Sequence, residues 1–332
     1  MSRELTITSG RQIGNDMIAA GVGAALAAVC GAALLAPRTR RTPPSAARIK
    51  GPRLWRRAER PTTTAARRLN RAAGVLAFSV LADSAVEHYR GSFSNPAMYV
   101  PLAVSGLALA TSGHGTMDRR ATAHRIRDAS YSAALLTGAI GTGFHLYNIL
   151  KRPGGWRWEN LFYSAPVGAP SALLLSGLFG FMAERVRDAR SGSRPRLLGL
   201  PLGRLTAALT AAGLLGTAGE AGLLHFRGAY HNPFMFVPVT LPPTAALLMS
   251  EVALGPKRPR RVFSRWWLRL TAAIGFAGVG FHAYGVHRNM GGWRNWRQNI
   301  LNGPPLPAPP SFAGLALAGL AALSLREEAK DA

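Results

Sequence analysis

The chain has 332 residues, of which 48% are hydrophobic, and a formal net charge of +25. Such a charge suits a nucleic-acid-binding protein only if the basic residues share one folded surface. Here they fall in loops between long apolar segments, so the composition argues against nucleic acid and indicates a lipid bilayer as the partner. The single cysteine, Cys30, lies inside an apolar segment and indicates neither a disulfide framework nor a redox compartment.

Nine segments are apolar over lengths expected of membrane spans. They cover 17–36, 72–87, 97–112, 129–150, 161–183, 205–226, 234–254, 266–286 and 306–325. The first has no basic region before it and no clear cleavage site, so residues 1–36 are predicted to hold a transmembrane helix rather than a signal peptide. Segment 37–69 is rich in Pro and Arg without apolar periodicity, and we predict a basic cytoplasmic linker there.

Alternate loops differ strongly in basic charge. Loops 37–69, 113–128, 184–204 and 255–269 hold 27 of the 40 Lys and Arg residues. The four intervening loops, which follow the second, fourth, sixth and eighth spans, hold eight. Because basic loops stay in the cytoplasm, this asymmetry predicts a multi-pass protein of the cell (inner) membrane. Its N-terminus would lie outside and its C-terminus in the cytoplasm.

An internal repeat organises the chain after the linker. Residues 88–101 and 225–238 are identical at eight of fourteen positions, at an offset of 137. We therefore predict one repeat over 70–190 and another over 204–327, each with four spans inserted the same way up. Short loops favour antiparallel neighbours, so each repeat should be an up-down-up-down bundle. The predicted fold is an all-α integral membrane protein with one N-terminal transmembrane helix and two tandem parallel four-helix-bundle repeats.

Four histidines occupy equivalent positions in the two repeats and are candidate cofactor ligands. They are His88 with His225, and His145 with His282. The first of each pair ends the first helix of its repeat, and the second lies near the end of the third helix, so all four are expected near the outer face. First and third helices are diagonal in such a bundle, and histidines facing across a diagonal can supply both axial ligands of one haem iron. The sequence therefore predicts a haem b iron in each repeat.

A glycine strip precedes the second histidine of each pair. The strips are Gly138 and Gly141 in the first repeat, and Gly275 and Gly278 in the second. Offsets of three, four and seven place each strip on the same helical face as the histidine that follows it. A smooth strip of this kind leaves room for a flat ligand, either a porphyrin or a quinone. The alternative is that the glycines let two helices approach closely while the histidines form hydrogen bonds between helices.

Acidic residues recur within the first span of each repeat. Asp83 and Glu220 lie five residues before the first histidine of each pair. A carboxylate inside a span is costly, so an acid kept in both copies should have a partner. We expect either an ion pair with Arg90 or Arg227, or a position between the two repeats. An ion pair would be structural, whereas a position between the repeats would suit a proton path or a metal site.

The outer loops 154–160 and 291–299 combine glycine turns, tryptophans and polar side chains. Anchoring at the membrane surface accounts for the tryptophans. The recurrence of arginine and asparagine in register suggests instead a lid or a docking face for an extracytoplasmic redox protein. The residues concerned are Trp156, Arg157, Trp293 and Arg294.

No nucleotide-binding loop, nucleophile elbow or Rossmann turn is present in the sequence. The leading prediction is a membrane subunit of an electron-transfer assembly that binds haem b or quinone near the outer face. One alternative is a small-solute or ion transporter whose path lies between the repeats and uses the two acids. The other is a membrane scaffold without a cofactor.

Overall fold

The computed structural model describes residues 61–189, 195–255 and 261–328. The first predicted span, with Cys30, and the greater part of the predicted linker lie outside these residues. The described chain is almost entirely helical. Its two strands, β1 (Arg196–Leu197) and β2 (Leu200–Pro201), form a small antiparallel hairpin.

The same order of elements occurs twice along the chain. A long helix is followed by a short 3-10 helix, two further long helices, a short helix and a last long helix. In the first half these are α2 (Pro61–Arg90), η1 (Pro96–Tyr99), α3 (Val100–Met117), α4 (Arg125–Leu150), α5 (Trp158–Tyr163) and α6 (Gly168–Arg187). In the second half they are α7 (Leu202–Arg227), η2 (Pro233–Phe236), α8 (Val237–Leu254), α9 (Arg261–Arg288), α10 (Trp296–Asn302) and α11 (Pro310–Glu328), with η3 (Gly292–Asn295) before α10.

Two predicted boundaries are wrong. The linker was expected to reach residue 69, but the described chain is helical from Pro61 onward. The span expected over 161–183 is divided between α5 and α6, with Pro166 between them. A proline inside a helix removes a hydrogen bond and clashes with the carbonyl four residues earlier, so the long helix begins only at Gly168.

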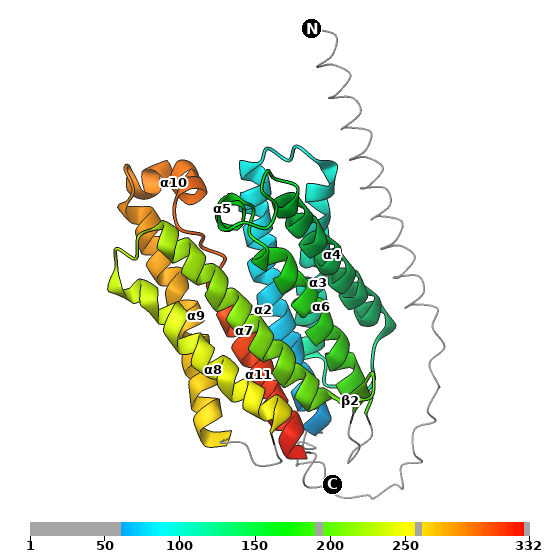
Figure 1. Ribbon diagram of the computed structural model, residues 1–332. Helices are drawn as coiled ribbons and strands as arrows, with labels where there is room; N and C mark the ends of the chain where they lie inside the picture. The colour runs from blue at the N-terminus through cyan, green and yellow to red at the C-terminus, as the bar shows by residue number, and fades with distance from the viewer. Residues whose placement is uncertain (1–60, 190–194, 256–260, 329–332) are drawn as a thin grey trace, which may run out of the picture.

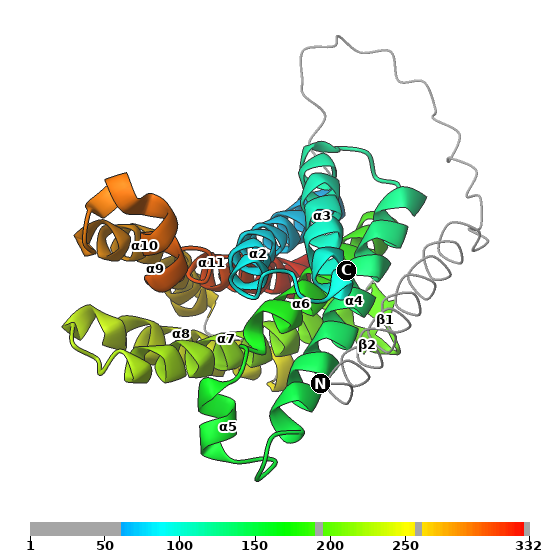
Figure 2. The same ribbon diagram turned by 90° about the horizontal axis from the view of Figure 1, so that it is seen from above.

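The long helices of each half surround a common axis. In the first half α2 and α4 each pack against α3 and α6, so α2 and α4 lie on a diagonal. In the second half α7 and α9 each pack against α8 and α11. Figure 2 shows α3 and α4 on one flank of the molecule and α8 and α9 on the other, with α2, α6, α7 and α11 between them. The expected diagonal between first and third helices is therefore present in both halves.

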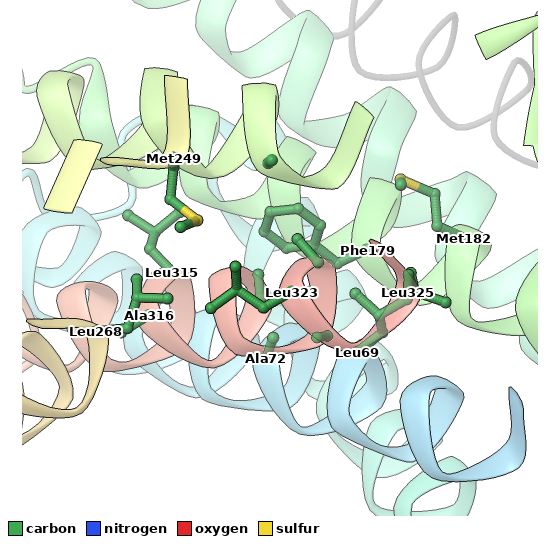
Figure 3. Packing of buried hydrophobic residues seen from close by; sticks show 14 of the residues in the cluster. Leu69, Ala72, Phe179, Met182, Met249, Leu268, Leu315, Ala316, Leu323 and Leu325 are labelled. Atoms are coloured by element: carbon green, nitrogen blue, oxygen red, sulfur yellow. The ribbon is translucent and has the colours of Figure 1, made fainter. Parts of the chain in front are cut away.

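The main hydrophobic core lies between the two halves rather than inside either bundle. Helix α2 packs against α11, and α6 contacts α7. Figure 3 shows Leu69 of α2, Phe179 of α6 and Leu315 of α11 directed into this shared core, with Met249 of α8 beside them. All four side chains are almost completely buried. The halves are thus joined by close packing along most of α11.

Four of the described helices are long and apolar enough to cross a membrane. They are Thr62–Arg90, Arg125–Leu150, Leu202–Arg227 and Pro233–Leu254. Large apolar side chains also point outward from the helices, where they suit lipid better than water. Examples are Phe78, Leu107, Leu215, Leu247 and Phe276. These features indicate a membrane protein with apolar surfaces in contact with lipid.

A buried polar network stabilises one end of the first half. The guanidinium of Arg127 (α4) binds Glu184 (α6), with Nε 2.9 Å from Oε1, and Asp118 after α3, with Nη1 2.8 Å from Oδ2. Arg187 donates to the carbonyls of Asp118, Arg120 and Gly115. Partial burial raises the pKa of Asp118, but hydrogen bonds from the Arg120 N–H and the Arg127 guanidinium outweigh it and hold the pKa below its usual value.

The second half replaces most of this network with apolar packing. Ser264 stands where the first half has Arg127, Leu268 where it has Tyr131, and Leu323 where it has Glu184. Only the last arginine is kept: Arg326 donates to the carbonyl of Gly255, as Arg187 does to that of Asp118. The two halves therefore share a backbone plan but not a way of filling its interior.

Replacing Glu184 by alanine should strongly destabilise the protein. It would remove the buried carboxylate that Arg127 and Arg187 share. Breaking a buried ion pair by removing one partner costs about 3–5 kcal/mol. Glu87→Ala is the matched control, since its pair with Arg90 is largely exposed and such pairs contribute about 0–1 kcal/mol. Thermal unfolding in detergent measures both variants. Equal losses of stability would contradict the structural role of the network.

Candidate functional site

The repeated sequence motifs gather at one end of the molecule. Figure 1 shows α5 and α10 at the same end, next to the last turns of α2, α4, α7 and α9. The four histidines lie in those last turns or close to them, and all four are partly buried. This is the end that the charge asymmetry predicts to face outward.

Each of the four imidazoles forms the same kind of hydrogen bond. The Nδ1 atoms of His88 and His225 lie 2.7 Å from the carbonyl oxygens of Met98 and Met235, respectively. Those of His145 and His282 lie 2.5 and 2.6 Å from the carbonyl oxygens of Pro166 and Pro305, respectively. Because a carbonyl oxygen can only accept, Nδ1 carries the proton in every case, and a neutral ring keeps its lone pair on Nε2.

Prolines remove the backbone amides that these carbonyls would bind in a regular helix. Pro166 precedes Pro170 by four residues, and Pro305 precedes Pro309 by four, so the amide four residues on is missing in both cases. The carbonyl of Pro305 also accepts from the N–H of Ala308 at 3.3 Å. Similarly, Pro101 and Pro238 stand three residues after the two methionines, where a 3-10 hydrogen bond would need an N–H. The histidines thus form hydrogen bonds between the last turns of one long helix and the segment that leads into the next long helix.

The turns that follow the first histidines are strained in the same way in both halves. Phe93 and Tyr230 have φ of 46°, in the left-handed region that side chains disfavour. Phe93 stacks on Tyr99 with ring centroids 4.4 Å apart, and Tyr230 stacks on Phe236 at 4.5 Å. Side-chain packing therefore holds a backbone conformation that costs of order 1–3 kcal/mol per residue.

The two histidines of each predicted pair lie near the same ends of diagonal helices of their own half. Each of the four has Nδ1 engaged by the backbone. That the two rings of a pair face each other across the bundle stays a prediction.

The glycine strips do not provide room for a flat ligand, and that prediction is wrong. A Cβ added to Gly138 would lie 2.2 Å from the backbone N of Leu174 in α6, and one on Gly141 would lie 3.1 Å from Pro170. In the second half α11 fills the equivalent space. A Cβ on Gly275 would approach Ala313, and one on Gly278 would approach Pro309, at 2.7 and 2.8 Å, respectively. The glycines are needed for close helix packing, which was the alternative interpretation.

The two acids lie on the first helix of each half, and Glu220 reaches across the junction between the halves. Asp83 lies in α2, four residues before Glu87. Glu220 in α7 accepts a hydrogen bond from the backbone N–H of Gly168, 3.2 Å from Oε1. A Cβ on that glycine would lie 1.6 Å from Glu220 Oε2, so only glycine lets the carboxylate reach the start of α6.

Neither arginine near the acids forms the ion pair that was expected. Arg90 binds Glu87 instead, with Nη1 2.6 Å from Oε1, and also donates to the carbonyl of Leu301 in α10. Arg227 lies over the ring of Phe162 in α5, 5.5 Å from its centroid. Both are long side chains at helix ends. Arg90 reaches α10 and Arg227 reaches α5, each a short helix of the other half, and neither pairs with Asp83 or Glu220.

The asparagines that recur in the outer loops hold these loops in shape. Asn160 Nδ2 donates to the carbonyls of Pro153 and Gly155, the latter at 2.8 Å. Asn299 donates in the same way to Met290 and Gly292. The two asparagines are 139 residues apart, two more than the repeat offset, because the second loop is longer.

The residues proposed as a docking face lie in these same loops. Trp156 and Trp293 are 66% and 46% exposed, so both can meet lipid headgroups or a partner. Arg157 and Arg294 are also exposed. Among the described residues there is no group of three or more potential metal ligands. A metal held here would need the paired imidazoles alone or an exogenous ligand.

Gly138→Ala should lower the stability of the protein, because its methyl group would press on the α6 backbone. Overpacking of this kind costs about 1–3 kcal/mol. Gly143→Ala, five residues further along α4, is the matched control, since a Cβ there meets nothing within 4 Å. The midpoint of thermal unfolding in detergent distinguishes the two variants. A ligand groove along the strip would instead leave Gly138→Ala as stable as the control.

Comparison with known proteins gives no family for this chain. No protein-family model matches it, and no curated protein or solved structure matches it either. No residue is therefore assigned a role through a relative. The function is inferred from the geometry of the paired histidines and of the acids at the junction.

Proposed function

We propose that the chain is a multi-pass membrane subunit of an electron-transfer assembly, and that each pair of imidazoles binds the iron of a haem b. The observation that supports this is the Nδ1–H bond of all four histidines to a backbone carbonyl. Ligating histidines are oriented in this way, because it fixes the tautomer and leaves Nε2 free to bind the metal. Diagonal helices of a bundle can bring two such ligands to one iron.

The donor atoms support haem iron better than quinone. The glycine strips support neither ligand, because both a porphyrin and a quinone would need the space beside the strips that α6 and the α11 end of the chain fill. The haem interpretation depends on donor atoms, and these are available as His88 with His145 and as His225 with His282. Each Nε2 would lie about 2 Å from the iron. A bound haem would supply one-electron redox chemistry, while the protein would supply the ligands and exclude water.

In this proposal the chain crosses the inner membrane nine times, with the histidine end outside. The basic loops 113–128 and 184–204 then lie in the cytoplasm. An extracytoplasmic redox protein would dock on the exposed loops that carry Trp156 and Trp293. Electrons would thus enter or leave at the face where the histidines lie.

The protein purified after expression with added haem precursor should show a Soret band and bis-histidine α and β bands on reduction. His145→Asn should remove about half of the signal, and His145→Asn with His282→Asn should remove all of it. Asparagine is chosen because its amide N lies near the position of Nδ1, so it keeps the donor to the carbonyl while removing Nε2. The loss of stability in His145→Asn should therefore stay below the roughly 1–3 kcal/mol expected in His145→Leu, where the hydrogen bond to the carbonyl is broken outright.

His231→Asn serves as the control, because this histidine is exposed and has no equivalent in the first half. It should leave the spectrum unchanged. The haem proposal fails if the wild-type protein has no Soret band after haem supplementation, or if His145→Asn with His282→Asn keeps the band. A full-intensity band after His145→Asn alone would place the haem in the second half only.

A specific observation also supports a transporter, the alternative function. Asp83 and Glu220 lie on the helices that begin the two halves, and Glu220 bonds to the backbone of Gly168 across the junction. No cation forms an ion pair with either acid among the described residues. Intramembrane acids of this kind are typical of ion or proton paths. The path would run along the junction between the halves.

Proton flux into proteoliposomes, driven by a potassium diffusion potential, tests this alternative. Asp83→Asn combined with Glu220→Gln should abolish the flux, because neither replacement can release a proton. Glu87→Gln is the control and should conduct normally, since Glu87 has no equivalent in the second half. Equal flux in the double variant and the wild type would exclude the acids as the path. A protein with neither a Soret band nor a flux would be a scaffold.

A further inference from the structure

A basic cleft opens at the end of the molecule opposite the histidines. It lies between α2, α9 and α11, where the first and second halves meet, and its volume is about 460 Å³. Two arginines from α2 and two from α9 line it, together with apolar residues of α11. The lining residues are Arg68, Arg71, Arg265, Arg269, Leu317, Leu320 and Ser324.

The cleft gathers positive charge without a matching acid. No carboxylate lines it. Arg71 and Arg269 form no ion pair with any residue that the structure describes, and Arg269 lies over the ring of Trp266, 5.5 Å from its centroid. Arg68 donates a hydrogen bond to the hydroxyl of Ser324, which fixes one edge of the cleft. Four neighbouring cations repel one another, so an anion between them would be strongly favoured.

The fold itself does not require these arginines. The equivalent positions in the other half are Leu205, Ala208, Asp128 and Ser132. Asp128 there forms an ion pair with Arg185 of α6. The same helix arrangement is thus built once with an internal ion pair and once with four arginines, of which Arg71 and Arg269 form no ion pair among the described residues. The arginines are therefore explained by a ligand rather than by helix packing.

We propose that this cleft binds the phosphate group of an acidic phospholipid from the cytoplasmic leaflet. The planar guanidinium groups can donate paired hydrogen bonds to phosphate oxygens. Leu317 and Leu320 form an apolar wall along which an acyl chain can lie. Basic clefts between transmembrane helices on the cytoplasmic side suit acidic headgroups, and the charge asymmetry places this end in the cytoplasm.

The full-length protein in neutral detergent tests the proposal through its thermal unfolding midpoint. Dioleoyl phosphatidylglycerol should raise the midpoint by about 5 °C at saturation, whereas dioleoyl phosphatidylcholine should not. Arg71→Gln with Arg269→Gln should weaken the affinity for phosphatidylglycerol at least about tenfold, since two charge-assisted contacts are lost. Arg152→Gln with Arg288→Gln removes two exposed arginines at the other end and should keep the wild-type response.

Inorganic phosphate at the same concentration separates the two sources of a phosphate group. No shift with phosphate, alongside a shift with phosphatidylglycerol, supports a lipid site. An equal shift with phosphate would overturn the lipid and show a site for a soluble anion. A full response in Arg71→Gln with Arg269→Gln would overturn the cleft as the site. If that variant fails to fold, Arg71→Lys with Arg269→Lys takes its place, because it keeps the charge but loses the paired hydrogen bonds of the guanidinium groups. A smaller midpoint shift with phosphatidylglycerol than in the wild type would then support the cleft as the site, and an equal shift would overturn it.

Discussion

Four imidazole N–H groups hold together the end of the molecule where the proposed function resides. Prolines at the starts of α3, α6, α8 and α11 remove backbone donors, and the histidines at the ends of α2, α4, α7 and α9 replace them. Without these bonds each long helix would be joined to the next only by a strained turn or a proline-rich loop. The proposed ligand atoms, the Nε2 lone pairs, are available because Nδ1 already has this task. The fold therefore depends on Nδ1 of each ring, and the proposed metal binding depends on Nε2.

The two halves use the same backbone plan for different purposes. The first half fills its interior with the Arg127–Glu184 network, whereas the second has serine and leucine at the matching positions. The second half instead contributes Arg265 and Arg269 to the basic cleft. Buried ion pairs gain less than apolar packing for the same volume, so the network is more easily understood as a means of fixing how α3, α4 and α6 meet. The close packing along α11 belongs to both halves.

The sequence predicted an all-α fold with helices long and apolar enough to cross a membrane, and the repeat helped because it gives each position a second example. It was less successful where a short-range pattern had two physical meanings. The strip that contains Gly138 suits either a flat ligand or a neighbouring helix, and only the position of Leu174 decides between them. The recurrence of asparagine in the outer loops was visible in the sequence, but the role of Asn160 and Asn299 in holding the loops was not, because the carbonyls they bind are brought to them only by the fold. The basic cleft could not be predicted, because its arginines come from helices almost 200 residues apart.

The contacts between the halves follow a reciprocal rule. Helix α2 packs on α11 and α7 contacts α6, so the first helix of each half meets the last helix of the other. Likewise Arg90 reaches α10 and Arg227 reaches α5. Two identical subunits related by a two-fold axis make contacts of this kind, because a surface of the first subunit that contacts a second surface of its partner is contacted in turn by the partner's copy of that first surface. In a homodimer every substitution would appear on both sides of the axis. A single fused chain is free of that restriction, so one side can carry arginines where the other keeps Asp128.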